Sequence, residues 1–181
     1  MIQLAKIISG GQTGADRGGL DAAIVLGIPH GGYCPRGRRA EDGRIPLKYG
    51  LIETIGANYY ARTSENVALA DATFIFARNA DSLERGSLLT RELAEHARKP
   101  FAVFGVFEPE VDRAVKRWLA RVRPVVLNIA GNRESVTPGI QAAVRNVLIA
   151  ALDNVQIIER PTKSEGLGAL AAALKKAGLA P

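Results

Sequence analysis

The sequence has few of the residues that disulfides, metal sites and membrane spans require. Its 181 residues include one cysteine and two histidines, so an intrachain disulfide is excluded and a zinc site built from Cys and His is not expected. The lone thiol, Cys34, is interpreted as a buried apolar side chain. No run of about 18 apolar residues occurs, and the first residues lack the zones of a signal peptide. We therefore expect a cytoplasmic protein that has no membrane contact.

Aromatic side chains are also scarce, at 6% of the sequence, although the net charge is +6. Surfaces that bind nucleic acid combine a basic stripe with interleaved aromatic residues. The clearest basic cluster here, Arg36, Arg38 and Arg39, is followed at once by Glu41 and Asp42. Because mixed charge of this kind suits one small anionic ligand better than a polyanion, we expect no nucleic-acid partner.

The most informative segment is glycine-rich and follows an apolar run at residues 4–9. Residues 9–17 read SGGQTGADR, and a helix is predicted to begin near Arg17. Glycines let the chain turn tightly and let a ligand approach main-chain N–H groups, and a helix N-terminus attracts negative charge. A strand, a glycine-rich turn and a helix together predict an anion site, most often for phosphate. The segment has neither a Walker lysine nor G-x-G-x-x-G spacing, and a tight turn without a ligand is the alternative.

Strand and helix patterns alternate along the rest of the chain. Strands are predicted at 4–9, 30–33, 73–77, 101–106 and 124–130, and helices at 17–26, 58–69, 87–97, 110–122 and 138–152. The strands are nearly continuous apolar runs, which is typical of parallel strands covered on both faces. The sequence thus predicts an α/β fold: a doubly wound, mainly parallel Rossmann-like sheet with helices on both faces.

We expect this single domain to occupy residues 1–153. Residues 154–181 are interpreted as a C-terminal extension, with a small edge strand at 156–158 and a helix at 164–176. The polar stretch at 34–50 is predicted to be a long loop, and loops of this length inside compact domains are usually functional.

Ligands of open parallel sheets bind at the carboxyl ends of the strands. Four polar turns are predicted to meet at that edge, at residues 9–17, 34–39, 85–90 and 128–135. They supply the candidate residues for binding an anionic ligand, which are Gly10, Gly11, Gln12, Thr13, Gly14, Asp16, Arg17, Arg36, Arg38, Arg39, Gly86, Ser87, Thr90, Gly131, Arg133, Glu134 and Ser135.

Several of these residues have a second interpretation. Asp16 and Ser135 are also plausible helix caps, and Arg17 is placed to pair with Asp42 or Glu41 instead of a ligand. The arginines at 36, 38 and 39 can contact the ligand, or they can be charges of a solvated loop that contact only water. No metal site made of protein side chains is expected.

Residues 8–17 (ISGGQTGADR) and 27–43 (GIPHGGYCPRGRRAEDG) closely resemble the molybdenum carrier family, as do the shorter runs NIAG, RES and PGI between 128 and 140. The resemblance covers about residues 2–150. It groups the chain with Rossmann-like nucleotide-sensing and nucleotide-processing proteins, including cytokinin-activating phosphoribohydrolases. It implies binding of molybdenum cofactor, an anionic pterin that carries a phosphate and a dithiolene-held oxo-metal. It also implies a homo-oligomer, dimer or tetramer, and a partner enzyme that receives the cofactor.

The same resemblance bears on whether the protein is an enzyme. The phosphoribohydrolases carry P-G-G-x-G-T-x-x-E, in which the glutamate is catalytic. The matching stretch here, residues 84–90, reads ERGSLLT, so Thr90 stands in place of that glutamate. Glu92, two residues further along a helix, faces away. The resemblance therefore favours a binding or carrier protein with no catalytic residue.

Two other functions are compatible with the sequence. One is a nucleotide hydrolase or N-glycosidase that uses Asp16, Glu41, Asp42 or Glu134 as acid or base. The other is a sensor of a nucleotide or another phosphate-bearing ligand that passes a signal to a partner protein.

Overall fold

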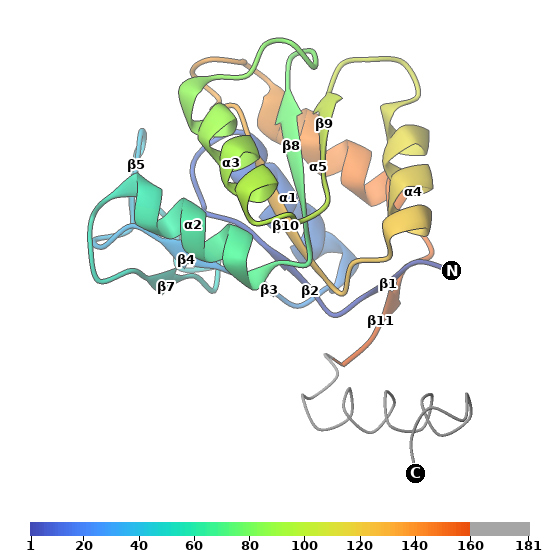
Figure 1. Cartoon of the computed structure of the whole chain (residues 1–181), viewed down its shortest axis with the longest axis horizontal. Coiled ribbons are helices and arrows are strands. Elements are labelled where there is room, and N and C mark those ends of the chain that lie inside the picture. Colours follow the sequence, from blue (N-terminus) through green and yellow to red (C-terminus); the bar gives the residue numbers. More distant parts are fainter. Residues whose placement is uncertain (160–181) are drawn as a thin grey trace.

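A computed structural model describes residues 1–159 of the chain (Figure 1). Five parallel strands form the central sheet in the order β3–β2–β10–β8–β9. Their bounds are β2 (Lys6–Ile8), β3 (His30–Gly31), β8 (Ala72–Ala77), β9 (Phe101–Gly105) and β10 (Val126–Gly131). The predicted helix at 164–176 lies outside the described residues.

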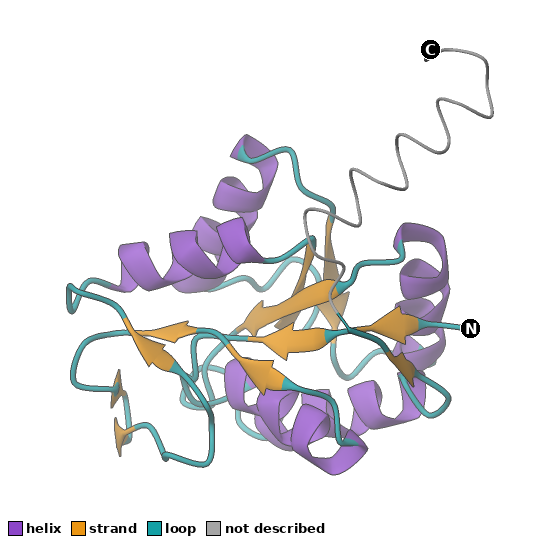
Figure 2. Cartoon of the chain, turned by 90° about the horizontal axis from the view of Figure 1, so that it is seen from below, coloured by secondary structure: helices purple, strands orange, loops and turns teal. Residues whose placement is uncertain are grey.

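Helices cover both faces of this sheet, as the apolar strands predicted (Figure 2). One face carries α1 (Ala15–Leu26), α4 (Val111–Val122) and α5 (Ile140–Ala151). The other face carries α2 (Tyr59–Leu69) and α3 (Arg85–His96). The Rossmann-like α/β prediction is confirmed. None of the helices within residues 1–159 has the length and apolar character needed to cross a bilayer.

The main core lies between the sheet and the α1–α4–α5 face. Phe74 of β8 packs edge-on against Phe104 of β9 and Trp118 of α4, with ring centroids 5.1 and 4.9 Å apart. Burial of each large apolar side chain contributes roughly 1.5–3 kcal/mol. The ends of the helices follow local rules: Asn58 caps α2 by accepting a hydrogen bond from Tyr60 N, and Gly27 ends α1 in the left-handed conformation.

Two predicted strands are each divided in the structure. The run at 4–9 yields β2 and a separate β1 (Gln3–Leu4), which pairs in parallel with β11 (Gln156–Ile157). The run at 30–33 yields β3 and β4 (Tyr33–Cys34), and β4 leaves the sheet to pair with β7 (Ile52–Glu53). Gly32 lies between β3 and β4 with φ +116°, and a Cβ there would lie 2.4 Å from Ser9 O, so only glycine permits this bend.

The long loop at 34–50 also contains regular structure. Its tip is a small antiparallel hairpin made of β5 (Arg39–Ala40) and β6 (Gly43–Arg44), joined by Glu41 and Asp42. The hairpin stands on the β3 side of the sheet (Figure 1). It follows from the topology that α1 leaves β2 toward one face and α3 leaves β8 toward the other. The loops after β2, β8 and β10 therefore border the crevice where such sheets bind ligands.

Candidate anion-binding site

The glycine-rich loop joins β2 to α1 and is buried along residues 9–14. Gly14, with φ +80°, lies directly against the loop after β10: a Cβ there would lie 2.5 Å from Asn132 O and 2.6 Å from Glu134 N. The N–H of Ala15 donates to Asn132 O at 3.1 Å. Main chain therefore contacts main chain between the loops that follow β2 and β10, and a side chain at position 14 would separate them.

The loop offers main-chain donors at the start of α1. Gln12 N donates to Asp16 Oδ2 at 3.2 Å, and Thr13 N donates to the side-chain oxygen of Gln12 at 3.0 Å. Within residues 1–159, the N–H groups of Gly10, Gly11 and Gly14 make no hydrogen bond. Buried N–H groups are rarely left without an acceptor, and donors at a helix N-terminus favour an anion.

One carboxylate, that of Glu41 at the hairpin tip, is held by donors from two sheet loops. Thr13 Oγ1 donates to it, and Ser135 donates through Oγ at 2.5 Å and through N at 3.2 Å. Arg133 Nη1 lies 3.8 Å from Oε2, the oxygen that accepts from Ser135 Oγ. Desolvation alone would raise the pKa of Glu41, but the hydrogen bonds from Ser135 and Thr13 outweigh it and the pKa is lowered. This cluster of donors binds a carboxylate and has the chemistry to bind a phosphate.

Asp16 lies beneath the glycine-rich loop and pairs with Arg62 of α2, with Oδ2 and Nη1 3.0 Å apart. Burial raises the pKa of Asp16 above its ordinary value, and Arg62 offsets only part of that rise. Arg62 lies directly against the loop, because a Cβ on Gly10 would be 1.6 Å from its Nη1. Its Nε is buried without a hydrogen-bond partner among the described residues.

The loops that follow β8 and β10 are held together by a second acid–arginine pair. Glu84 accepts hydrogen bonds from Arg133 Nε at 3.1 Å and Arg133 N at 3.2 Å, and this pairing raises the pKa of Arg133. Asn132 Oδ1 accepts from Ser87 Oγ at 2.9 Å and Glu84 N at 3.1 Å. The start of α3 is thereby fixed beside the end of β10.

The model of the Circularly permutated YpsA SLOG family matches residues 7–152. The chain belongs to this family. A crystal structure of a protein from Syntrophus aciditrophicus SB, named a putative molybdenum carrier protein, is 40% identical, with a TM-score of 0.78. The match covers 83% of this chain and 96% of that one, which confirms the resemblance drawn from the sequence. No curated protein matches the chain.

In this YpsA-family chain, Arg17 makes an ion pair of the kind left open by the sequence. Its Nη1 and Nη2 donate to the two carboxylate oxygens of Asp42 at 2.6 and 2.7 Å, and its Nε donates to Gly11 O at 3.1 Å. The hydrogen bonds from Arg17 lower the pKa of Asp42. Arg17 therefore connects the glycine-rich loop to the hairpin tip.

The three arginines at 36, 38 and 39 separate into two environments. Arg38 is buried, and its guanidinium donates to the carbonyl oxygens of Ile45, Pro46, Tyr49 and Leu51 at 2.9–3.0 Å. Arg36 and Arg39 are exposed and line a hollow of about 520 Å³ with Glu53 and Ile55. The structure thus gives Arg38 a structural role in the loop, and it does not bring the three arginines together.

Other residues predicted from the sequence have local structural contacts. Thr90 Oγ1 donates to Gly86 O within α3. Glu134 accepts hydrogen bonds from Gly139 N and Gln141 N, so it satisfies the start of α5. Asp16 does not cap α1, because the helix begins after Gly14 and Asp16 lies inside its first turn. Ser135 does not cap α5, because that helix begins after Gly139.

Glu84 and Asn132 are not among the residues that the sequence predicted to bind a ligand. Glu84 directly precedes α3 and Asn132 directly follows β10, and polar residues in the loops that leave the strands of an open sheet are a usable signal. Arg62 lies off the apolar stripe of the helix predicted at 58–69, where a side chain can point toward the site or into solvent, and its contact with Asp16 decides between the two.

Gly10→Ala is expected to displace Arg62 from Asp16 while the fold is kept. The new methyl group would overlap the flexible end of the Arg62 side chain, and Gly10 does not have a positive φ. Without that guanidinium, the pKa of Asp16 should rise further, as measured by NMR titration of its carboxyl carbon. Gly56→Ala, where the closest atom is 3.8 Å from the added Cβ, is the control. An unchanged Asp16 titration in Gly10→Ala would contradict this account.

Proposed function

We propose that this protein binds a small phosphate-bearing ligand at the carboxyl edge of its sheet. The observation that carries the proposal is the cluster of donors around Glu41: the Thr13 hydroxyl, the Ser135 hydroxyl and N–H, and the nearby Arg133. These groups come from loops that only the fold brings together, and the N–H groups of the glycine-rich loop add further donors. Hydroxyl, amide and guanidinium donors around one anion are the usual chemistry of phosphate sites.

The ligand that we propose is an anionic pterin, with molybdenum cofactor as the cargo. A relative that is 40% identical over 83% of the chain carries the name of a molybdenum carrier. The half-exposed ring of Tyr59 lies beside Arg62, which contacts the glycine-rich loop at Gly10, and it offers a stacking surface there. Residues 1–159 contain no group of three His, Cys, Asp or Glu side chains placed to hold a metal ion. The metal would therefore stay on the dithiolene of its pterin, and the protein would hold the phosphate.

Native mass spectrometry of freshly purified protein tests the identity of the ligand. We expect a bound species that releases a fluorescent pterin after acid oxidation, together with molybdenum or tungsten in metal analysis. The relative that supports this expectation is similar over nearly its whole length. A nucleotide bound in place of the pterin would contradict the proposal that the ligand is a pterin. It would be consistent with the proposed phosphate site.

A second candidate function is hydrolysis of a nucleotide, and Asp16 is the observation that favours it. Its pKa is raised by burial, so the carboxyl holds a proton to higher pH than an ordinary aspartic acid and can act as a general acid. Release of base or phosphate from nucleoside monophosphates by the wild type, with loss of that activity in Asp16→Asn, would support this function. Equal activity in the two proteins would exclude Asp16 as the acid.

We also propose that the protein is a homo-oligomer that transfers its ligand to a partner enzyme. Three apolar side chains, Leu47, Ile52 and Ile55, are exposed and lie close together in sequence, in the segment that connects β3 to α2. Contact between copies would remove such surface from water. Light scattering combined with size-exclusion chromatography distinguishes a dimer or tetramer from a monomer.

A further inference from the structure

The hairpin that carries Glu41 has a fixed base and an exposed tip. At the base, Arg38 is 5% exposed and Ile45 is 1% exposed, and the Arg38 guanidinium binds four carbonyl groups of the chain that follows the hairpin. Residues 41–44 are exposed, and the strands β5 and β6 are two residues long. Because the tip buries little apolar surface, polar contacts and not apolar packing hold it in place, and an anion that takes over those contacts can release it while the base stays fixed.

Polar contacts to four residues hold the tip on the glycine-rich loop, on α1 and on the loop after β10. Glu41 N donates to the side-chain oxygen of Gln12 at 3.0 Å, the Glu41 carboxylate accepts from Thr13 and Ser135, and Asp42 pairs with Arg17. The Glu41 carboxylate brings one negative charge and two acceptor oxygens to a group of hydroxyl, amide and guanidinium donors. A phosphate group would need the same donors.

We propose that Glu41 is an internal competitor of the ligand's phosphate, so that the hairpin tip closes the anion site and binding releases it. This inference rests on the proposed function, because it places the phosphate at the donors that Glu41 occupies. Attachment to the chain gives the carboxylate a high effective concentration. A weak anion is thereby excluded, whereas a ligand with additional contacts displaces the tip.

The competition has a defined effect on affinity. The apparent dissociation constant equals the intrinsic constant divided by the fraction of molecules whose site is open. If the tip is closed in about nine molecules of ten, removal of the competitor should tighten binding about ten-fold. Glu41→Gln keeps the size of the side chain but removes the charge, and hydrogen bonds to a neutral acceptor are roughly half as strong.

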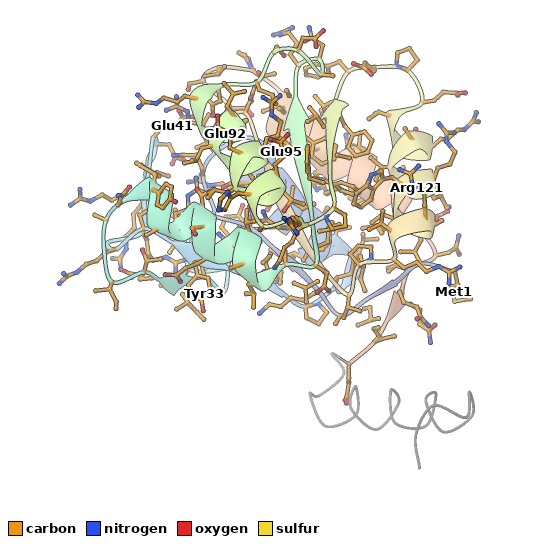
Figure 3. The ribbon with its side chains drawn as sticks, in the orientation of Figure 1. Met1, Tyr33, Glu41, Glu92, Glu95 and Arg121 are labelled. Carbon is orange, nitrogen blue, oxygen red and sulfur yellow. The ribbon has the colours of Figure 1, made fainter. Side chains whose placement is uncertain are left out.

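The experiment compares the binding of inorganic phosphate to the wild type and to Glu41→Gln, followed by NMR at the amides of Gly14 and Ser135. Glu92→Gln is the matched control, since Glu92 is an exposed glutamate on α3 and loses the same charge (Figure 3). We expect Glu41→Gln to bind phosphate more tightly than the wild type, by several-fold and up to about ten-fold, and Glu92→Gln to bind as the wild type does.

The outcomes separate this inference from the proposed function. Equal affinity in the wild type and Glu41→Gln, or weaker binding in the variant, would overturn the proposal that Glu41 competes with phosphate. Either result would still be consistent with a phosphate site at these donors. Absence of phosphate shifts at Gly14 and Ser135 in both proteins would overturn the phosphate site and the competition together. An equal gain in Glu92→Gln would assign the effect to net charge, and would also overturn the competition.

A second measurement uses the unmodified protein, so it does not depend on the folding of a variant. Hydrogen exchange at the amides of Ala40, Glu41 and Gly43 should accelerate when phosphate is added, because the tip is released. Exchange at Ile45 N, which donates to Arg38 O at the base, should stay unchanged. Slower exchange at the tip in phosphate would show that the anion closes the hairpin, and would overturn the proposal.

Discussion

Gly131→Ala is expected to lower the free energy of unfolding by about 3 kcal/mol or more. Gly131 ends β10 at the centre of the sheet with φ +152°, and an added Cβ would lie 2.0 Å from Phe76 O in β8. Neither atom can move without separating two central strands, and Asn132 N donates to the same carbonyl at 2.8 Å. Urea denaturation followed by circular dichroism measures the change.

Gly139→Ala is the control for this experiment. Gly139 also has a positive φ, +86°, but no atom lies within 4 Å of the added Cβ. Its replacement should therefore cost only the strain of a left-handed residue, about 1 kcal/mol. Similar losses in the two variants would mean that the conformation of Gly131, and not its contact with β8, decides the stability. The sequence had placed Gly131 among the ligand-binding candidates, and the structure gives it this packing role.

The second large effect is expected for Arg38→Met, which should destabilise the protein by about 3 kcal/mol. The methionine fills the space of the side chain but leaves the carbonyl groups of Ile45, Pro46, Tyr49 and Leu51 without their donor. A buried acceptor that loses its partner costs about 1–3 kcal/mol, and part of this cost is recovered where water enters. Thermal and urea denaturation measure the loss.

Arg36→Met tests the same substitution at an exposed arginine two residues away. Arg36 lies on the surface of the same loop, so its replacement should change stability by less than about 0.5 kcal/mol. A loss in Arg36→Met as large as that in Arg38→Met would show that net charge, and not the bonded carbonyl groups, accounts for the effect. Comparison of Arg36→Met with Arg38→Met thus distinguishes an arginine that stabilises the fold from one that lies in solvent.

Both experiments concern residues that the sequence grouped with the ligand site. Glycine and arginine are frequent in phosphate sites because they expose the main chain and bind oxyanions. The same properties serve a close contact between strands and a clamp on carbonyl groups. Nothing in the sequence distinguishes these uses, because the distinguishing atoms, Phe76 O for Gly131 and Ile45 O for Arg38, lie on segments that only folding brings near.

Local patterns alone determined the order of the main elements, the parallel sheet with helices on both faces, and the glycine-rich turn before α1. Hydrophobic periodicity and end signals such as Asn58 and Gly27 act over a few residues, so they can be read without the fold. Only the tertiary structure decided that the hairpin folds back on the glycine-rich loop, that Glu41 meets Thr13 and Ser135, and that Arg62 meets Asp16. These contacts join residues 28 to 94 positions apart, and their partners are set by the packing of whole elements, which no local pattern records.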